Sequence, residues 1–204
     1  MLTHAELAAF AGRSYSAPRT GLVALDVRYD LISVGNERLV VIPGTHPADL
    51  LDWIRDLRAW PWWAPRVGFV HSGFGKGGEA LYQRLRVDLV ANQRSLAITG
   101  HSLGGALAQY LAAKMVAEGC PPQRLVTFGA PRVGWLNPYL RLLTAQIPDR
   151  AFYQRAGDLV PTAAARCLGF NHCARGVSIG LSIGNFIVNH SIAQYAVDLT
   201  ALGL

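Results

Sequence analysis

The chain has 204 residues, of which 51% are hydrophobic and 16% are charged, and its formal net charge is +6. This composition is typical of a single globular domain over residues 1–204, and it excludes an intrinsically disordered chain. The basic residues are scattered along the chain, so the sequence predicts no nucleic acid partner. The excess charge could favour an anionic surface such as lipid headgroups, although a solvated surface is the simpler interpretation.

Two stretches bear on export and membranes. Residues 1–6 lack a positive start followed by an apolar run, so no signal peptide is visible. We therefore expect a cytoplasmic protein, or one exported by a route without a standard signal. Residues 176–197 contain no charged side chain, but Asn185, Asn189 and Gln194 argue against a transmembrane segment there.

The three cysteines, Cys120, Cys167 and Cys173, do not have the spacing of a metal site. Cys167 and Cys173 could close a short loop through a disulfide bond. Free thiols are the simpler interpretation in a chain without an export signal. The sequence predicts no metal ion and no other cofactor.

At the start of the chain, the hydrophobic pattern predicts a helix, a hairpin and a second helix. The first helix is predicted over residues 4–13. Residues 21–34 and 38–42 read as strands around a turn, which indicates an antiparallel hairpin. The second helix is predicted over residues 47–59, where leucine and isoleucine recur at helical spacing.

From residue 60 onward, predicted strands and helices alternate. Strands are predicted over residues 67–70, 95–98, 125–128, 151–155 and 177–183, and helices over 78–93, 106–118, 137–146 and 189–202. This alternation predicts an α/β fold with a mostly parallel central sheet, flanked by helices and beginning with an antiparallel pair. In such sheets, functional sites form at the carboxyl ends of the strands.

The motif Gly100-His101-Ser102-Leu103-Gly104 lies between a predicted strand and a predicted helix. A G-x-S-x-G motif in this context predicts a nucleophile elbow, in which the glycines allow strand and helix to approach closely. The turn would expose the Ser102 hydroxyl and place the Leu103 N–H at a helix start, where it can donate to an oxyanion. The alternative is a chance occurrence of the motif in a glycine-rich chain.

A serine nucleophile needs a base, and the base needs a carboxylate that orients it. On this fold the three occur in the order Ser, Asp or Glu, His. Asp158 follows the strand predicted over 151–155 and is the preferred carboxylate, although an ordinary turn residue is the alternative interpretation. His190 follows the last predicted strand and is the preferred base, and His172 is the alternative.

Several motifs occur in an order that resembles the class 3 lipases, the fungal triacylglycerol lipase type. The elbow Gly100-His101-Ser102-Leu103-Gly104-Gly105-Ala106 carries the resemblance, together with Val41-Ile42-Pro43-Gly44-Thr45, His71-Ser72-Gly73-Phe74, Thr127-Phe128-Gly129-Ala130-Pro131, Asp158-Leu159-Val160-Pro161 and Asn189-His190. The motifs run from about residue 38 to 195. Their combination is specific where each piece alone is not.

The resemblance implies an α/β-hydrolase fold and an ester hydrolase with Ser102 as nucleophile, Asp158 as orienting carboxylate and His190 as base. It also implies an oxyanion hole made by the N–H groups of Thr45 and Leu103. The expected substrate is an ester or lipid, cleaved by a lipase or carboxylesterase. A phospholipase or feruloyl-type esterase is the alternative within this class of enzymes. An inactive hydrolase-fold module that binds a membrane or a protein is the alternative outside enzymes.

Residues 46–65 are predicted to form a mobile lid. The helix predicted over 47–59 has one apolar side, and four tryptophans lie on or near it: Trp53, Trp60, Trp62 and Trp63. Tryptophan combines a large apolar area with an N–H group and is favoured at lipid–water boundaries. We therefore expect these four to contact a lipid–water interface. The alternative is a helix whose apolar side packs on its own core.

Overall fold

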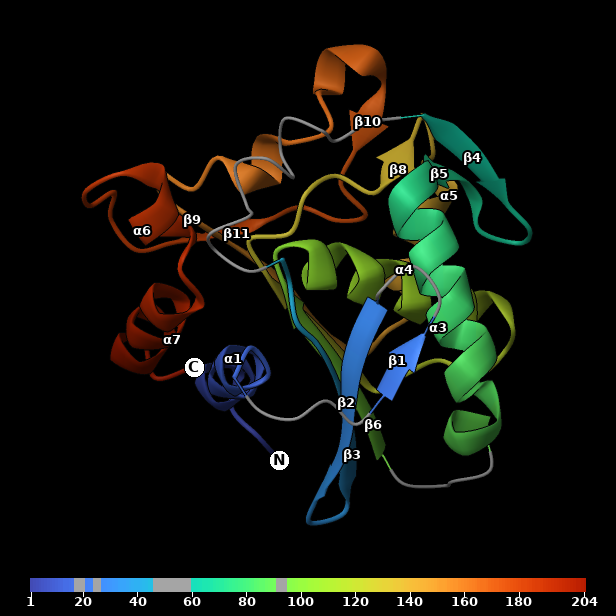
Figure 1. Ribbon diagram of the computed structural model, residues 1–204, viewed down its shortest axis with the longest axis horizontal. Coiled ribbons are helices and arrows are strands. Elements are labelled where there is room, and N and C mark those ends of the chain that lie inside the picture. The colour runs from blue at the N-terminus through green and yellow to red at the C-terminus, as the bar shows by residue number, and fades with distance from the viewer. Residues whose placement is uncertain (17–20, 24–26, 46–59, 91–94) are drawn as a thin grey trace.

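The computed structural model describes residues 1–16, 21–23, 27–45, 60–90 and 95–204 (Figure 1). Its main sheet has seven strands in the order β1-β2-β3-β6-β7-β9-β11. Their bounds are β1 (Gly21–Val23), β2 (Val27–Val34), β3 (Glu37–Ile42), β6 (Ser95–His101), β7 (Arg124–Phe128), β9 (Asp149–Arg155) and β11 (Val177–Ile179). The first three strands are antiparallel, and every pairing from β3 onward is parallel. This arrangement confirms the predicted mostly parallel sheet with an antiparallel start.

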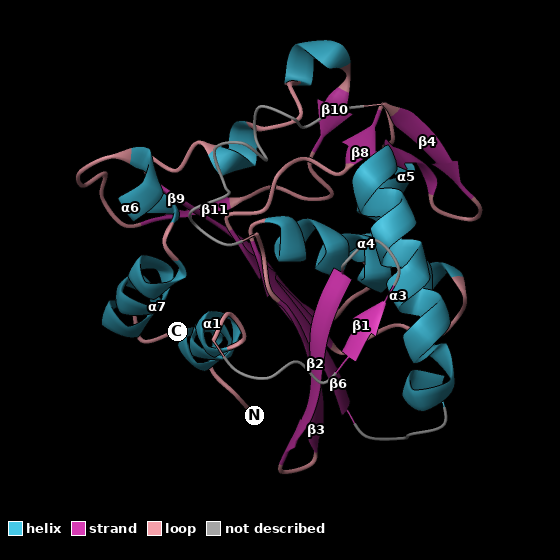
Figure 2. Cartoon of the chain, viewed as in Figure 1, coloured by secondary structure: helices cyan, strands magenta, loops and turns pink. Residues whose placement is uncertain are grey.

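Helices cover both faces of the main sheet (Figures 1 and 2). The helices α1 (His4–Arg13) and α7 (Ile192–Ala201) pair on one face, and α3 (Ser72–Val90), α4 (Leu103–Ala117) and α5 (Tyr139–Thr144) lie on the other. Side chains alternate across a strand, so β3 sends Leu39 and Val41 to the α1–α7 side and Val40 and Ile42 to the α3–α4 side. Each face of the sheet therefore has its own hydrophobic core.

Helix α4 runs through the centre of the larger core. Almost all of its side chains are buried, which fits a sequence of alanine, leucine and glycine without a polar face. Its one lysine, Lys114, is also buried, and its ammonium group contacts Glu118 at 2.8 Å and Glu79 at 3.8 Å. The rigid position of α4 matters because its first turn carries the predicted elbow.

A second, smaller sheet has four antiparallel strands in the order β10-β8-β5-β4. Their bounds are β10 (Phe170–Asn171), β8 (Gly134–Trp135), β5 (Gly68–His71) and β4 (Pro61–Ala64). Residues 61–64 were expected in the mobile lid and instead form β4, whose backbone pairs with β5 along its whole length. The remaining lid residues 46–59, with the helix predicted over 47–59 and Trp53, lie outside the described residues.

The strand β4 points its tryptophans in opposite directions, because successive side chains of a strand face opposite sides. Trp62 packs against the core beneath, whereas Trp63 is 58% exposed. Trp60, just before the strand, is 70% exposed. Of the four tryptophans expected at an interface, Trp60 and Trp63 are thus exposed, Trp62 is partly buried, and Trp53 lies outside the described residues.

Several predicted boundaries were wrong, and the strand predicted over 177–183 ends at Ile179. Helix α3 begins at Ser72 rather than at residue 78. Four glycines in its first turns suggest a loop in the sequence, but in the structure they lie in the helix and contact neighbouring side chains. The strand predicted over 21–34 is two strands. His190 was expected at the start of the last helix, but it ends the short helix α6 (Phe186–His190), and α7 begins two residues later.

The three cysteines are unpaired, with Cys167 exposed and Cys173 buried. In the described ranges, no set of histidine, cysteine and acidic side chains is grouped as metal ligands would be. None of the described helices combines the length and the apolar character that crossing a membrane requires.

Candidate active site

Ser102 lies in the tight turn between β6 and α4, with a φ of 56° and a ψ of −129°. A positive φ is strained for a residue other than glycine and requires support from the surroundings. The flanking glycines provide the space for this turn. A Cβ on Gly104 would overlap the carbonyl oxygen of Ile42, and one on Gly100 would overlap the backbone of Gly104. The local geometry is that of the predicted elbow.

Two groups around the elbow have unsatisfied hydrogen-bonding capacity. The Ser102 Oγ is buried and has no hydrogen-bond partner among the described residues. Leu103 is the first residue of α4, so its N–H has no acceptor within the helix. The loop after β3 passes directly beside them, since a Cβ on Gly44 would lie 2.7 Å from the Cβ of Ser102. The fold thus brings Thr45, which follows Gly44, close to the elbow.

His190, the last residue of α6, and Asp158, which follows β9, form a buried pair. The His190 Nδ1 lies 2.8 Å from the Asp158 Oδ2, so this nitrogen carries the proton and donates it. The other carboxylate oxygen accepts the Val160 N–H at 2.9 Å. Gly129 packs against the pair with a φ of 56°, and a Cβ there would lie 2.7 Å from the Asp158 Oδ2. A glycine is therefore required beside the pair.

The ring of His190 is fixed so that its Nε2 offers a lone pair. This atom is buried and, like the Ser102 Oγ, has no hydrogen-bond partner among the described residues. The residue before the serine, His101, stacks on the His190 ring with 4.5 Å between ring centroids. Asp158 and His190 are therefore in direct contact, and the residue before Ser102 lies against the ring of His190.

His172, the alternative base, contacts no carboxylate in the part of the chain that the structure describes. Its Nε2 donates to the carbonyl oxygen of Pro161 at 2.9 Å. Burial, and then the positive charge of Arg132, lowers the pKa of His172 to about 4. His172 therefore remains neutral at ordinary pH and braces the loop that follows Asp158.

Tyr195, on α7, was not predicted from the sequence. Its hydroxyl donates to the Asp158 Oδ2 at 2.6 Å and accepts the N–H of Arg155 at 2.9 Å. Burial, and then the charge of Asp158, raises the pKa of Tyr195 well above its usual 10. The tyrosine therefore stays protonated and supplies a third hydrogen bond to the carboxylate.

His101 and Tyr15 connect the loop after β3 to His190, and the sequence did not predict this connection either. The His101 Nε2 donates to the His190 carbonyl oxygen at 2.7 Å, so its Nδ1 is an acceptor and receives the Tyr15 hydroxyl at 2.8 Å. The Tyr15 oxygen in turn accepts the Gly44 N–H at 3.1 Å. Burial, and then His190, lowers the pKa of His101 well below 6.5. A neutral His101 can thus hold both contacts.

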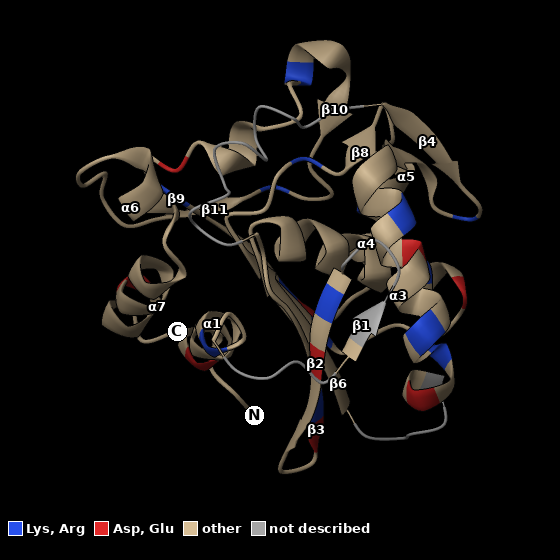
Figure 3. Ribbon diagram, viewed as in Figure 1, with Lys and Arg blue, Asp and Glu red and all other residues tan. Residues whose placement is uncertain are grey.

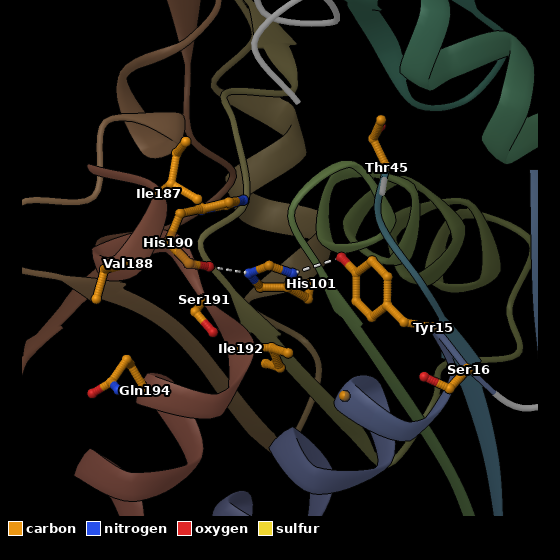
Figure 4. A pocket seen from close by; sticks show the side chains of 11 residues that line it. Tyr15, Ser16, Thr45, His101, Ile187, Val188, His190, Ser191, Ile192 and Gln194 are labelled. Carbon is orange, nitrogen blue, oxygen red and sulfur yellow. Dashed lines mark hydrogen bonds between the residues drawn. The ribbon is translucent and has the colours of Figure 1, made fainter. Parts of the chain in front are cut away.

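A cavity of about 470 Å³ opens beside these groups. Figure 4 shows Thr45 and Tyr15 on one side of it and Ile187 and Val188 on the other, with His101 between them. His190 lines the same cavity. An apolar wall next to a histidine with a free Nε2 is suited to hold the apolar part of a small organic substrate.

We predict that Tyr195→Phe will lower the rate of any reaction that uses the Asp158–His190 pair by about tenfold, because the carboxylate loses a hydrogen bond worth about 1.5 kcal/mol. Tyr153→Phe is the matched control. Its hydroxyl bonds to His4 at 2.8 Å on the same side of the sheet but away from the pair. Steady-state kinetics and thermal unfolding of both variants test this prediction. An equal loss of rate in the two variants would contradict it.

Comparison with known proteins places the chain in a family. A model of the family described as lipase (class 3) matches residues 39–167. A lipase of Caenorhabditis elegans is 35% identical over 101 residues, which make up 47% of this chain and 28% of that protein. A secreted mono- and diacylglycerol lipase of Fusarium solani is 31% identical over 108 residues, 50% of this chain and 32% of that protein. The chain thus spans about a third of the length of these relatives.

Solved structures show the fold. The triacylglyceride lipase of Rhizomucor miehei has a TM-score of 0.72 and 20% sequence identity, covering 86% of this chain and 78% of its own. A triacylglycerol lipase with a serine-protease triad at its catalytic centre has a TM-score of 0.66 and 24% sequence identity. The match covers 79% of this chain and 64% of that chain. The fold is that of the α/β-hydrolases, and because the family model matches well over half of its residues, the chain belongs to the class 3 lipases.

Proposed function

We propose that the protein is a serine ester hydrolase that cleaves acyl esters of lipids through an acyl-enzyme on Ser102. One observation carries the proposal. His190 is held by Asp158 through its Nδ1, while its Nε2 and the Ser102 Oγ are both buried without a partner. Buried polar groups are normally hydrogen-bonded, so two unpaired ones at an elbow indicate groups reserved for a substrate. The lipase relatives support a lipid ester as that substrate.

In the proposed reaction, the His190 Nε2 takes the proton of the Ser102 hydroxyl as the oxygen attacks the ester carbonyl carbon. Asp158 keeps His190 in the required tautomer and stabilises the imidazolium that forms. The same proton then passes to the alcohol oxygen as the ester bond breaks. Water, activated by His190, attacks the acyl-enzyme and releases the acid.

The negative oxygen of the tetrahedral intermediate requires donors that are already in place. The Leu103 N–H, at the start of α4, is one proposed donor, and the helix dipole adds to its effect. The Thr45 N–H is the other. Its support is the packing of Gly44 against Ser102, and the hydrogen bond from the Gly44 N–H to Tyr15 holds that loop in place.

The 470 Å³ cavity is proposed to receive the alcohol part of the ester. His190 must protonate the alcohol oxygen as it leaves, so the group bonded to that oxygen lies on the His190 side of the site. The cavity is lined by His190 and by Ile187, Val188 and Ile192, which favour an apolar alcohol over a polar one. The acyl part would extend to the opposite side of Ser102.

A panel of substrates tests this function. Chromogenic esters from acetate to palmitate, a triacylglycerol and a phospholipid would be compared under identical conditions, together with labelling by a fluorophosphonate probe. Labelling of Ser102 with turnover of apolar esters is the expected result. The absence of both labelling and turnover would favour a hydrolase-fold module that only binds.

We further propose that Trp60 and Trp63 contact the lipid–water interface. Both are exposed, and Trp63 stacks edge-on against the exposed Phe69 with 5.1 Å between ring centroids. Figure 1 shows β4, which contains Trp63 and directly follows Trp60, toward the end of the molecule where the parallel strands of the main sheet finish. The lid over residues 46–65 stays a prediction, and within its bounds residues 61–64 form β4.

Replacing Trp60 and Trp63 together by serine should reduce the rate on emulsified triacylglycerol about tenfold or more. Each substitution removes a ring whose contact with the interface is worth about 1 kcal/mol. The rate on a soluble short-chain ester should not change. Val87→Ser, on α3, replaces a 70% exposed apolar side chain elsewhere and serves as control. An unchanged emulsion rate in the double variant would overturn the interface contact without affecting the proposed chemistry.

A further inference from the structure

A second hollow, of about 420 Å³, lies at the edge of the small sheet and shares no lining residue with the cavity beside His190. Arg141 of α5 and Arg166 of the short 3₁₀-helix η4 (Arg166–Leu168) line it, together with Leu136 and Asn171. Both arginines are exposed. The hollow therefore presents two guanidinium groups to whatever enters it.

These arginines belong to a group of positive charges that no acidic side chain pairs with among the described residues. Arg141 uses its Nε to donate to the carbonyl oxygen of His172 at 3.1 Å, which leaves its terminal nitrogens available. The guanidinium group of Arg166 has no hydrogen bond or ion pair with a described residue, and only its backbone carbonyl is bonded, to the Gly169 N–H. The neighbouring Arg132 donates to the carbonyl oxygens of Thr162 and Ala164, and in the described ranges no acidic side chain pairs with it.

The charges are close enough to affect one another. The pKa of Arg132 is lowered, first by burial and then by the charge of Arg166. The strands and the 3₁₀-helix around the hollow contain no acidic residue, as Figure 3 shows by the absence of red on β4, β8, β10 and the helical turn above them. Grouped cations repel each other, and an anion in the hollow would relieve this repulsion.

The shape of the donors indicates the kind of anion. A guanidinium group is a planar fork that pairs two N–H groups with two oxygens, and phosphate and carboxylate groups match it. Two such forks in one hollow can bind several oxygens of a tetrahedral phosphate at once. A carboxylate, with only two oxygens in a plane, would occupy one fork and leave the other unpaired.

The surface around the hollow is apolar and aromatic. Leu136 and Leu168, at its rim, are 69% and 62% exposed. Trp135 donates its indole N–H to the Leu168 carbonyl oxygen at 2.9 Å and contacts Phe69 with 5.6 Å between ring centroids. Phe69 in turn contacts Trp63. A continuous apolar surface thus runs from the proposed interface residue Trp63 to the edge of the arginine hollow.

We propose that the hollow of Arg141 and Arg166 binds the phosphate group of an anionic phospholipid while the adjoining aromatic surface rests on the same bilayer. A soluble phosphate would match the arginines but leave the exposed leucines and aromatic rings unexplained. An anionic lipid surface matches both, because its headgroups are negative and its boundary favours tryptophan. The proposal rests on the proposed contact of Trp60 and Trp63 with lipid, and it adds a preference for anionic bilayers.

The test measures binding of the full chain to vesicles made of ether-linked phospholipids, which an ester hydrolase cannot cleave. Binding to phosphatidylcholine vesicles is compared with binding to vesicles that also contain phosphatidylglycerol. Wild type should bind the anionic vesicles more tightly, and this gain should disappear at high salt. Arg141→Gln and Arg166→Gln should each reduce the gain about fivefold, the effect expected of one arginine near an anionic surface.

Arg86→Gln, an exposed arginine of α3, is the matched control and should keep the full gain. The soluble-ester rates of both hollow variants should equal that of wild type, since neither arginine lines the cavity beside His190. If Arg141→Gln and Arg166→Gln keep the full gain, the proposal is wrong. It is also wrong if glycerol phosphate binds at the hollow while anionic vesicles show no gain.

The two lipid proposals can fail separately. Loss of binding to neutral vesicles on replacing Trp60 and Trp63 tests the aromatic contact alone. The extra binding to anionic vesicles, and its loss on replacing the arginines, tests the hollow alone. Hydrolysis of a soluble ester reports on Ser102 whatever the vesicles show.

Discussion

Ser102→Ala is expected to abolish ester hydrolysis, with a loss of about 10⁵-fold in kcat, while the fold remains intact. Alanine removes the nucleophilic oxygen, and only binding and oxyanion stabilisation remain to accelerate the reaction. Initial rates on a soluble chromogenic ester measure the loss. The same variant should no longer react with a fluorophosphonate probe.

Ser102→Gly separates the loss of chemistry from the strain of the elbow. Both variants lack the hydroxyl, so both should be inactive. Residue 102 has a φ of 56°, which glycine adopts without strain and alanine does not, so the glycine variant should be more stable by about 1 kcal/mol. Chemical denaturation measures this difference in the free energy of unfolding. An alanine variant that keeps more than about a tenth of the rate would refute the assignment of the nucleophile.

The second large effect is expected at His190. His190→Ala should reduce kcat nearly as much as the loss of Ser102, because the serine is then without its base and the tetrahedral intermediate without its acid. Members of one catalytic unit do not contribute additively, so Ser102→Ala combined with His190→Ala should be no slower than Ser102→Ala alone. Both comparisons use the soluble ester, so that lipid binding does not enter.

His172→Ala is the control for this assignment. His172 donates to the Pro161 carbonyl and has no carboxylate partner, so its loss should cost about 1 kcal/mol of stability and change the rate by less than about tenfold. An inactive His172→Ala together with an active His190→Ala would exchange the two roles. That outcome would also show that the 2.8 Å contact between His190 and Asp158 does not identify the catalytic base.

Much of the candidate site could be predicted from the sequence because its signals are local. The elbow needs only a strand, two glycines around a serine and a helix, all within neighbouring residues. Asp158 was selected because it follows a strand, since parallel strands end at one edge of the sheet. The choice of His190 over His172 also agrees with the observed pairing, although His190 ends α6 rather than beginning the last helix.

The supporting residues could not be predicted, because their contacts join distant parts of the chain. Tyr195 reaches Asp158 only because α7 packs beside the sheet, 37 residues away in sequence. Tyr15 bonds to His101 across 86 residues. A tyrosine in a predicted helix or loop has no local feature that distinguishes a buried donor from an exposed side chain.

Which side chains lie on the surface also depends on contacts between distant parts of the chain. Four tryptophans near a predicted amphipathic helix suggest one mobile element, but pairing with β5 makes residues 61–64 a strand. The alternation of that strand turns Trp62 toward the core, where it is partly buried, and exposes Trp63. Arg141 and Arg166 are 25 residues apart and look like isolated charges in the sequence. Local hydrophobic periodicity and turn chemistry thus determined the elements and their order. Only the packing of those elements decided which side chains meet, because contact depends on distances in space that sequence spacing does not set.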